Sequence, residues 1–339
     1  MDFNPAVVTL ELTNACNLRC KHCYGNAGEY LENELEYEEI KKILKDLHDA
    51  GTMEIELSGG EPLLRHDFIK ILEAAQFFDF GIKIISNGTL INKKIAKDLS
   101  NFAIDHVQLS LEGLNESHEY LRGNGTFGST ITAINALRDE GMNVALRTTA
   151  TKKSLDDVNG IVELAVELGA YKFGVVRFFP AGRGMSYKDE LMLNANDMLH
   201  LHEIIKDIYR NYADKIDITA DPCGFFSQEI SDKFKRESTT MCPCGKTWCL
   251  IRPNGIVSPC EIMTIYAGNV RKQNFQEIWE SSPAFKLFRE FRPEFLKGTC
   301  NSCHHKDVCG GYCRALAILY TGDMYAEDFT CYHVLNKNK

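Results

Sequence analysis

The sequence predicts an α/β fold in which a partial (β/α)6 TIM-like barrel is followed by a cysteine-rich C-terminal domain. Two observations lead to this prediction. Short β-rich runs alternate with segments of helical period from the start of the chain to about residue 215. Beyond that point the alternation stops, and ten of the 13 cysteines in the 339-residue chain lie between Cys223 and Cys331. We therefore expect the barrel over 1–215, a bridging segment over 216–240 and the cysteine-rich domain over 242–335.

Six strands are expected from runs rich in β-branched and aromatic residues, at 7–13, 54–58, 82–86, 106–111, 143–150 and 172–179. Amphipathic segments separate them, and several close with a glycine that suits a helix C-terminus, as at Gly51, Gly141 and Gly169. Six strand–helix repeats imply a parallel sheet that is open or curled toward a barrel. Such sheets bind ligands at the carboxyl ends of their strands, so functional residues are expected there.

Composition and charge exclude several classes of function. The formal net charge is −9, and Lys and Arg are dispersed among Glu and Asp along the predicted helices. This pattern indicates a solvated surface and disfavours nucleic-acid binding. No apolar run approaches about 18 residues, so no membrane-spanning helix is expected. The chain opens without a secretory signal, which favours a reducing, cytoplasmic location where clustered cysteines more often bind metal than form disulfides.

Three cysteines, Cys16, Cys20 and Cys23, fall within eight residues directly after the first predicted strand. Structural zinc usually takes four ligands arranged as two close pairs, which this spacing does not supply. Three thiolates on one loop suit an iron–sulfur cubane in which one iron has no protein ligand. That iron is an open coordination site, which is typical of a catalytic centre. A chance cluster or half of a zinc site is the alternative interpretation.

The segment CNLRCKHC matches the CxxxCxxC signature of the radical S-adenosylmethionine (SAM) enzymes, and the strand ends that follow resemble that family in order. SGGEP (58–62) ends strand two, SNG (86–88) ends strand three and SLEG (110–113) ends strand four. SLEG carries Glu112 where many relatives have Asp, so no role is assigned to that residue. The resemblance implies that SAM is bound by His22, Gly59, Gly60, Glu61, Asn87 and Ser110.

By this resemblance, SAM chelates the open iron, and an electron from the cluster splits it to a 5′-deoxyadenosyl radical. The cofactor supplies the difficult step, while the protein holds SAM, excludes water and oxygen, and presents one substrate hydrogen. A low-potential electron donor of the flavodoxin or ferredoxin type is the implied partner.

The cysteine-rich tail resembles the SPASM module, which carries two auxiliary [4Fe–4S] clusters in addition to the first cluster. CPCGKTWCLIRPNGIVSPC (242–260) contains a Gly-x4-Cys step, and the later cysteines follow the spacing C-x2-C-x5-C-x3-C. We call the auxiliary cluster nearer the barrel the inner cluster and the other the outer cluster. The resemblance implies Cys242, Cys249, Cys260 and Cys313 as ligands of the inner cluster, and Cys300, Cys303, Cys309 and Cys331 as ligands of the outer cluster. Cys244 could replace Cys242, and a pair of zinc sites is the alternative to both clusters.

Three further residues are candidates for catalysis. Cys223 could donate a hydrogen to a substrate radical, as a lone cysteine does in some radical SAM peptide epimerases, or it could be an inert buried thiol. Glu261 follows Cys260, where sulfatase-maturing relatives carry an acidic base, and could accept a substrate proton; a surface carboxylate is the alternative. Arg122 matches an arginine found near SAM or the inner cluster in SPASM relatives, with a surface arginine as the alternative.

Two features of the predicted barrel stay open. Arg147 and Arg177 lie on strands five and six, and the period-two pattern does not settle whether either faces inward. The glycine-rich segment PAGRG (180–184) could close over substrate or form a plain turn.

The resemblance implies a radical SAM oxidoreductase that acts as a peptide maturase. Such an enzyme removes hydrogen from a residue of a ribosomally made peptide or small protein and leaves an oxidised residue, a crosslink or an inverted centre. The chain begins almost at strand one, so a separate leader-binding protein or direct recognition of the substrate is expected. Tetrapyrrole tailoring is the alternative function, and inward-facing Arg122, Arg147 and Arg177 would favour its polycarboxylate substrates. A non-catalytic iron–sulfur scaffold would not need SGGEP or SNG.

Overall fold

The computed structural model describes residues 3–220, 242–263 and 265–337. One ten-stranded sheet forms its centre, in the order β10-β9-β8-β1-β2-β3-β4-β5-β6-β7. The strands from β1 to β7 are parallel to one another, and β8 is parallel to β1. Strand β9 is antiparallel to both of its neighbours, β8 and β10. The strands are β1 (Val7–Glu11), β2 (Glu54–Ser58), β3 (Gly81–Ser86), β4 (His106–Ser110), β5 (Val144–Ala150), β6 (Lys172–Arg177), β7 (Asp217–Ala220), β8 (Trp248–Ile251), β9 (Ile256–Ser258) and β10 (Gly268–Asn269). The predicted partial barrel of parallel strands is confirmed.

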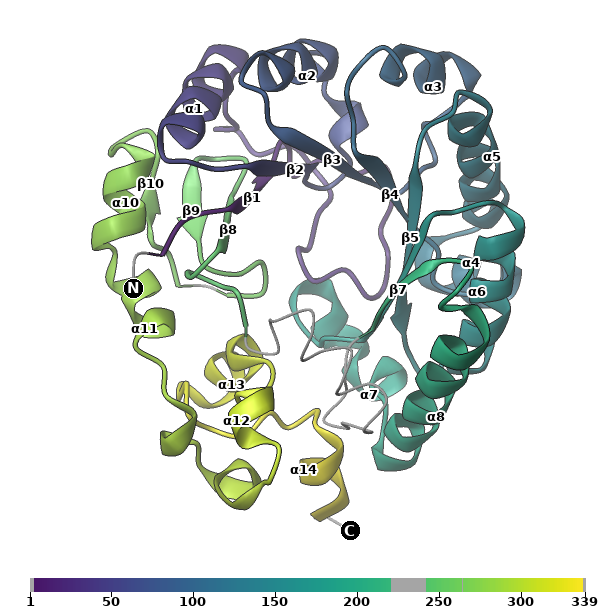
Figure 1. The fold of residues 1–339 in the computed structure, drawn as a ribbon, viewed down its shortest axis with the longest axis vertical. Coiled ribbons are helices and arrows are strands. Elements are labelled where there is room, and N and C mark those ends of the chain that lie inside the picture. Colours follow the sequence, from purple (N-terminus) through teal and green to yellow (C-terminus); the bar gives the residue numbers. More distant parts are fainter. Residues whose placement is uncertain (1–2, 221–241, 264, 338–339) are drawn as a thin grey trace.

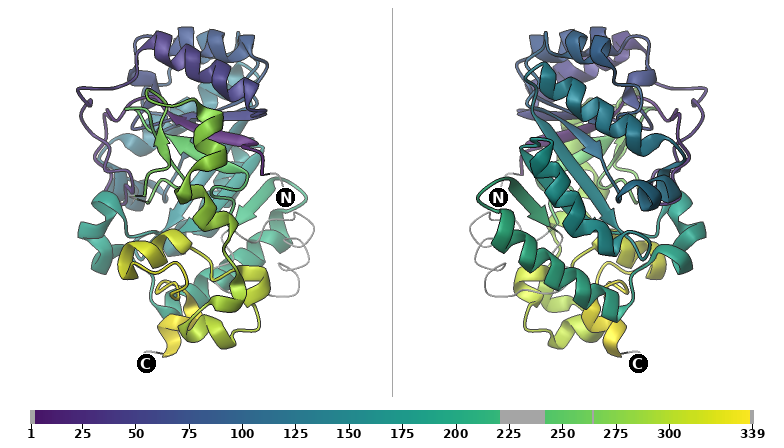
Figure 2. Two further views of the ribbon diagram at one scale, coloured as in Figure 1. Left: turned by 90° about the vertical axis from the view of Figure 1, so that its left-hand side faces the viewer. Right: turned by 90° about the vertical axis from the view of Figure 1, so that its right-hand side faces the viewer.

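Helices surround the outer face of this sheet, and the last three helices gather beyond one end of it (Figures 1 and 2). The barrel helices are α1 (Tyr37–Asp49), α2 (Phe68–Phe77), α3 (Lys93–Leu99), α4 (Asn115–Arg122), α5 (Thr126–Asp139), α6 (Val158–Glu167), α7 (Lys188–Leu191) and α8 (Ala195–Tyr212). The helices of the C-terminal part are α10 (Phe275–Ser281), α11 (Pro283–Arg289), α12 (Lys306–Cys309), α13 (Arg314–Thr321) and α14 (Tyr332–Lys337). None of the helices in these described ranges is long and apolar enough to cross a membrane.

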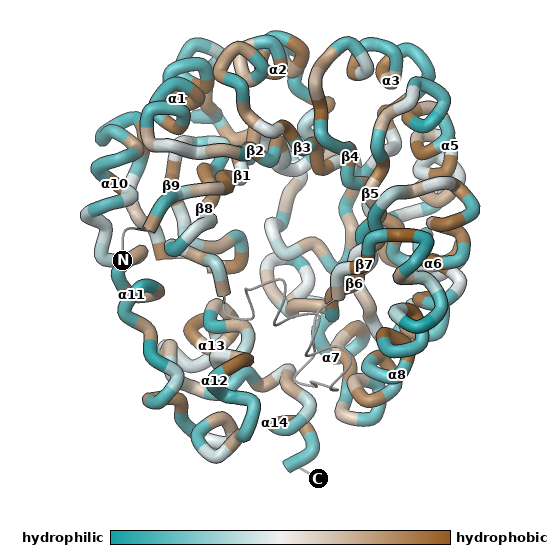
Figure 3. The backbone as a smooth tube through the Cα atoms, in the orientation of Figure 1, coloured by the Kyte–Doolittle hydropathy of each residue, from teal (hydrophilic) through white to brown (hydrophobic). Residues whose placement is uncertain are grey.

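Helix α1 shows how the sequence builds the helical layer. Its first turn is fixed by the Glu39 carboxylate, which accepts the backbone N–H of Glu36 at 2.9 Å. Its apolar residues recur with helical period and are all buried: Ile40, Ile43, Leu44 and Leu47. Figure 3 shows hydrophilic stretches of α1 and α2 along the outer rim of the molecule. The helices therefore bury one face against the sheet and leave the other in solvent.

The sheet extends past the six predicted strands at both edges. At one edge, β8 pairs with β1, placing Trp248 opposite Val7, and the Trp248 indole N–H donates to the Thr9 hydroxyl at 3.0 Å. At the other edge, β7 pairs with β6, although the sequence placed 217–220 in the bridging segment. The C-terminal part is thereby joined to the barrel through the sheet itself, beside the strand that precedes the first cysteines.

Candidate active site

The first three cysteines lie in the loop that follows β1, at the carboxyl end of the sheet. The N–H of Cys16 donates to the carbonyl oxygen of Gly28 at 2.8 Å, which closes the base of this loop. Cys16, Cys20 and Cys23 are all partly exposed free thiols. Burial raises the pKa of Cys20 to about 11, with the charge of Arg122 opposing the shift. A bound metal centre would favour the thiolate forms that burial alone disfavours.

The loop after β6 braces the cysteine loop. The Arg183 guanidinium donates to the carbonyl oxygens of Cys20 at 3.1 Å and Ala27 at 2.5 Å. The N–H of Gly184 donates to the carbonyl oxygen of Cys23 at 3.2 Å. This loop contains the PAGRG segment, for which the sequence left a substrate lid and a plain turn open. These contacts show that the segment holds the cysteine loop in place, a role that the sequence pattern did not indicate.

The turn after β2 approaches the cysteine loop at backbone distance. The N–H of Gly60 donates to the carbonyl oxygen of Thr13 at 2.7 Å, and that of Glu61 donates to Ala15 at 2.8 Å. A Cβ atom added to Gly60 would lie 2.2 Å from the Ala15 oxygen, and one added to Gly59 would lie 2.4 Å from the Thr13 oxygen. Only glycine therefore allows SGGEP to pack this closely against the loop.

Glu61 is fully buried and joins the ends of β2 and β3. Its carboxylate accepts the Ser86 hydroxyl and the backbone N–H of Asn87, both at 2.8 Å. Burial raises the pKa of Glu61 to about 7. The Asn87 amide in turn donates to the Cys16 sulfur at 3.8 Å. Glu61 and Asn87, two predicted SAM contacts, thus touch each other, and Asn87 also touches the first cysteine. Ser110 ends β4 at the same edge of the sheet.

His22, Glu112 and Arg122 form a buried network beside this edge. The Nε2 atom of His22 lies 3.1 Å from Oε1 of Glu112, and Nη2 of Arg122 donates to the same oxygen at 2.7 Å. The other carboxylate oxygen accepts the N–H of Thr149 in β5 at 2.6 Å. Burial opposes ionisation, but the charges of His22 and Arg122 hold the pKa of Glu112 well below its usual range. Glu112, which received no role from the sequence, therefore ties His22 and Arg122 to the barrel.

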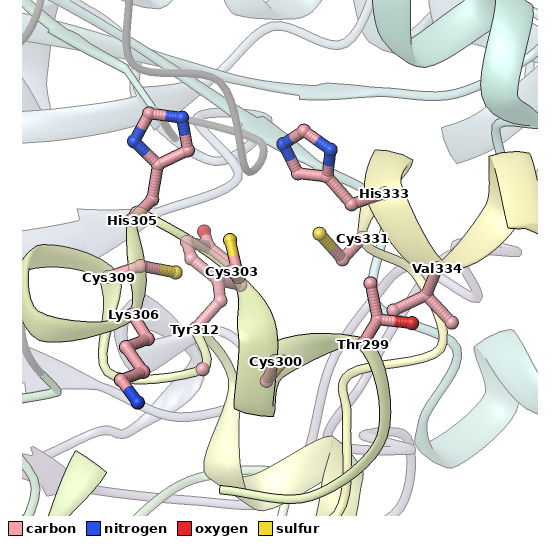
Figure 4. A pocket seen from close by; sticks show the side chains of 11 residues that line it. Thr299, Cys300, Cys303, His305, Lys306, Cys309, Tyr312, Cys331, His333 and Val334 are labelled. Carbon is pink, nitrogen blue, oxygen red and sulfur yellow. The ribbon is translucent and has the colours of Figure 1, made fainter. Parts of the chain in front are cut away.

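The four thiols assigned to the outer cluster line one cavity, with an empty volume of about 390 Å³ that is partly open to solvent. They are Cys300, Cys303, Cys309 and Cys331. Figure 4 shows the sulfur atoms of Cys303, Cys309 and Cys331 directed into the shared space. Burial raises the pKa of Cys309 to about 12 and that of Cys331 to about 11. The structure therefore brings together the whole predicted set.

A second group of thiols comes from the segments that flank β8 and β9 and from the residue before α13. The neighbouring thiols of Cys242 and Cys260, followed by burial, raise the pKa of Cys244 well above its usual range. Burial raises the pKa of Cys313, and the charges of Asp328, Cys260 and Cys242 raise it further. This thiol therefore lies near two members of the group, Cys260 and Cys242. All four pack into one apolar cluster with side chains such as Phe288.

Cys249 lies apart from these four thiols. It is fully buried on β8 and packs in the barrel core with Ile251, on the same face of the strand. Burial raises the pKa of its thiol, and Arg289 is the charged group that opposes the shift. The geometry therefore favours Cys244 over Cys249 as the companion of Cys242, Cys260 and Cys313.

Glu261 shares the barrel interior with carboxylates of β1 and β2. Burial, followed by the charges of Glu11 and Glu56, raises the pKa of Glu261 to about 7, with Arg147 and Arg252 opposing the shift. Nη1 of Arg252 lies 3.7 Å from Oε2 of Glu11. A carboxyl group with a pKa near neutrality is suited to proton transfer.

Comparisons with known proteins agree with this arrangement. Residues 10–165 match the model of the radical SAM superfamily, and residues 242–304 match SPASM, an iron–sulfur cluster-binding domain. An AdoMet-dependent heme synthase of Methanosarcina barkeri (strain Fusaro / DSM 804) is 33% identical over 346 residues, covering 96% of both chains. The mycofactocin maturase MftC of Mycolicibacterium smegmatis is 31% identical over 324 residues, covering 94% of this chain and 80% of MftC. The chain belongs to the radical SAM superfamily and carries a SPASM domain.

Solved structures share the fold of this radical SAM/SPASM enzyme. Streptococcus suis SuiB bound to its precursor peptide SuiA has a TM-score of 0.79 and 21% identity, covering 97% of this chain and 76% of SuiB. The anSMEcpe structure with bound AdoMet and Cp18Cys peptide has a TM-score of 0.78 and 18% identity, covering 98% of this chain and 99% of the other. At these identities the likeness establishes the fold alone.

The two domains imply SAM and [4Fe–4S] clusters as cofactors, and the described residues fit them. Four thiols line one cavity and four others pack into one apolar cluster, so each set can supply the four thiolate ligands that a cubane takes. Beside the first cysteines, the buried Nδ1 atom of His22 has no partner in the described chain, which leaves a polar atom for a ligand.

Three residues named in the sequence analysis remain: Arg147, Arg177 and Cys223. The charge of Arg147 acts on Glu261, so this arginine faces the barrel interior. Arg177 is buried against Asp328 at 2.7 Å, in the contact between the barrel and the C-terminal domain. Cys223, the candidate hydrogen donor, lies outside the described residues.

Proposed function

We propose that this radical SAM/SPASM enzyme is a maturase that removes hydrogen from a residue of a ribosomally made peptide or small protein. The observation that carries the proposal is the carboxylate-rich barrel interior, where the charges of Glu11 and Glu56 act on Glu261. Arg252 is engaged there by Glu11 and by the carbonyl oxygen of Glu261 at 3.0 Å. A substrate with several carboxylates would meet like charges, whereas a peptide presents neutral or cationic groups. The similarity to the maturase MftC supports the same substrate class.

The proposal assigns each set of thiols to a cluster. The first cluster is held by Cys16, Cys20 and Cys23, the outer cluster by Cys300, Cys303, Cys309 and Cys331, and the inner cluster by Cys242, Cys244, Cys260 and Cys313. Bound to the first cluster, SAM supplies the radical that abstracts the substrate hydrogen. The inner set includes Cys244 in place of Cys249, because Cys244 packs in one cluster with Cys242, Cys260 and Cys313.

The surrounding residues hold the cofactor and move a proton. His22, Gly59, Gly60, Glu61, Asn87 and Ser110 form the SAM site. Arg122 acts through Glu112, which it contacts at 2.7 Å, and is therefore a positioning residue for His22. Glu261 accepts the proton that the substrate radical loses, which its pKa of about 7 allows at neutral pH, and the auxiliary clusters would accept the electron released in this oxidation.

The test uses anaerobically reconstituted enzyme, SAM, a strong reductant and a short peptide encoded beside this chain. We expect 5′-deoxyadenosine together with a peptide that has lost two hydrogens, read by mass spectrometry. Glu261→Gln should keep SAM cleavage but lower product formation by at least about 100-fold. The exposed Glu280 provides a control, since Glu280→Gln should leave both reactions unchanged. An untouched peptide despite rapid SAM cleavage would contradict the proposed substrate class.

Epimerisation is a separate outcome of the same assay. It leaves the mass unchanged in ordinary water and adds one deuterium in heavy water. If Cys223 donates that hydrogen, Cys223→Ala should abolish deuterium uptake while SAM cleavage continues. Unimpaired uptake in this variant removes Cys223 from the mechanism.

Tetrapyrrole tailoring is the second candidate function. Two observations favour it: the 33% identity to a heme synthase over 96% of both chains, and the inward-facing Arg147, which could meet a substrate carboxylate. An iron porphyrin that carries several carboxylates should then be converted in the same assay, with SAM cleavage coupled to loss of side-chain carboxylate. Conversion of the porphyrin without any change to the peptide would replace the maturase proposal.

A further inference from the structure

Arg314 is a buried cation at the start of α13, directly after the proposed ligand Cys313. Its side chain is held by carbonyl oxygens on two sides. Nη1 donates to Met324 at 2.7 Å and to Ala326 at 2.6 Å, and Nη2 donates to Gly311. The Arg314 side chain is 2% exposed and is among the largest fully buried side chains of the described residues. These contacts fix its orientation.

The third nitrogen of this guanidinium has no hydrogen-bond partner among the described residues. The Nε atom of Arg314 is buried and unpaired within these residues, whereas Nη1 and Nη2 each donate to carbonyl oxygens. Leaving a buried donor unpaired costs on the order of 1–3 kcal/mol, and more for a charged group. Such orphaned donors are rare in folded proteins and call for a partner of another kind.

Arg314 also lies where the two auxiliary clusters would approach each other. It lines a cavity with an empty volume of about 230 Å³ together with Cys242, Lys246, Phe288, Phe291 and Gly310. Phe288 and Phe291 belong to one apolar cluster, against which Cys242 of the inner set and Cys300 of the outer set pack. Arg314 therefore lies beside thiols of both sets.

We propose that the Nε–H of Arg314 donates a hydrogen bond to the inner cluster and that the charge of this arginine raises the cluster's reduction potential. The inference rests on the proposed thiol ligands and is independent of the substrate. The potentials of such clusters depend on hydrogen bonds to their sulfur atoms and on nearby charge, and Arg314 supplies both. Arg314 is thus a positioning and tuning residue, since it reaches the cluster and not the substrate.

The first test requires no substitution at this position. Reconstituted enzyme is labelled with [15N]arginine, and the reduced auxiliary clusters are examined by pulsed electron paramagnetic resonance. Cys16→Ala, Cys20→Ala and Cys23→Ala are combined to remove the signal of the first cluster. We expect a nitrogen coupling from one arginine at the inner cluster, and its absence would overturn the proposal. An inner cluster that fails to form in this parent protein would instead refute the ligand assignment, as would its survival in a Cys244→Ala variant.

Substitutions then assign the coupling and measure its effect. Arg314→Lys should remove the nitrogen coupling, and Arg314→Gln should lower the inner cluster's affinity for an electron about tenfold, which corresponds to 59 mV. Arg289→Lys is the matched control, because Arg289 of α11 also buries a guanidinium nitrogen that has no hydrogen-bond partner among the described residues. It should leave both readouts unchanged. Loss of the coupling in Arg289→Lys, or an unchanged potential in a folded Arg314→Gln variant, would contradict the assignment to Arg314.

Discussion

Arg177 of β6 and Asp328 of the C-terminal domain form a buried ion pair, with 2.7 Å between Nη2 and Oδ2 and side-chain exposures of 2% and 0%. The Thr330 hydroxyl accepts from Nε and Nη2 of the same arginine at 3.0 and 2.8 Å. The guanidinium carbon lies 3.8 Å from the centre of the Tyr312 ring. Asp328 also accepts the backbone N–H of Cys313 at 3.2 Å. The pair therefore connects a barrel strand to the backbone of a proposed cluster ligand.

Replacing Arg177 by Met should lower the free energy of unfolding by about 3–5 kcal/mol, because Asp328 becomes an uncompensated buried charge. The measurement is an anaerobic denaturant titration of cluster-loaded enzyme. Lys297→Met is the control, since it breaks a pair with Asp323 in which the lysine is 66% exposed. An exposed pair of this kind contributes at most about 1 kcal/mol. Equal losses in the two variants would show that the buried pair does not stabilise the contact between the domains.

Gly60→Ala should weaken SAM binding by at least about tenfold, because the added Cβ would lie 2.2 Å from the carbonyl oxygen of Ala15. The SGGEP turn and the cysteine loop would have to separate, which displaces Glu61 from Ser86 and Asn87. Equilibrium binding of SAM to the reconstituted enzyme measures the effect. Gly25→Ala serves as control, since a Cβ there meets nothing within 4 Å. Unchanged SAM affinity in Gly60→Ala would remove this close approach from the requirements of the site.

The barrel could be predicted from sequence because its strands carry strong local signals. All six predicted strands are present, and the ends of the first four carry the predicted motifs at one edge of the sheet. Strand β7, by contrast, has four residues and too short a pattern to be distinguished from a loop. The pairing of β8 with β1 joins residues about 240 positions apart, so no local pattern could indicate it.

The candidate site was predictable in its residue types but not in its internal contacts. The spacing of cysteines in the sequence does not define the direction of each thiol side chain. The strand conformation of β8 directs Cys249 into the barrel core. The central position of Glu112 depends on His22, 90 positions away, and on Thr149 of the next strand. The pairing of Arg177 with Asp328 likewise forms only when the C-terminal domain packs against the barrel, so no local sequence pattern indicates it. These contacts are set by tertiary packing.

Cys244→Ala should remove the inner cluster, with the loss of about four irons and their sulfides per chain. The reason is that Cys244 packs in one cluster with Cys242, Cys260 and Cys313. Cys249→Ala should keep the full iron content, although removing a fully buried side chain will lower stability. Iron and acid-labile sulfide analysis after anaerobic reconstitution measures both variants. The reverse pattern, with iron lost from Cys249→Ala and retained in Cys244→Ala, would restore Cys249 to the ligand set.

His106 should make the stability of the enzyme fall as the pH drops from 6.5 to 4. Burial, followed by the charges of Lys83 and Lys172, lowers the pKa of His106 from 6.5 to about 4. Its Nδ1 atom lies 2.9 Å from the Tyr171 hydroxyl. Between these pH values the unfolded chain binds a proton that the folded chain does not, so unfolding becomes easier by at most about 3 kcal/mol.

Anaerobic thermal denaturation across this pH range tests the expectation with His106→Gln, whose side chain does not titrate and can still accept a hydrogen bond from Tyr171. The variant should have a shallower dependence of the melting temperature on pH than the parent enzyme. His200→Gln is the matched control, because His200 is 54% exposed and contacts the exposed Asp156 at 3.3 Å. Its profile should follow that of the parent. If His106→Gln also follows the parent profile, the acid sensitivity arises from another group, because this substitution removes the titrating imidazole of His106.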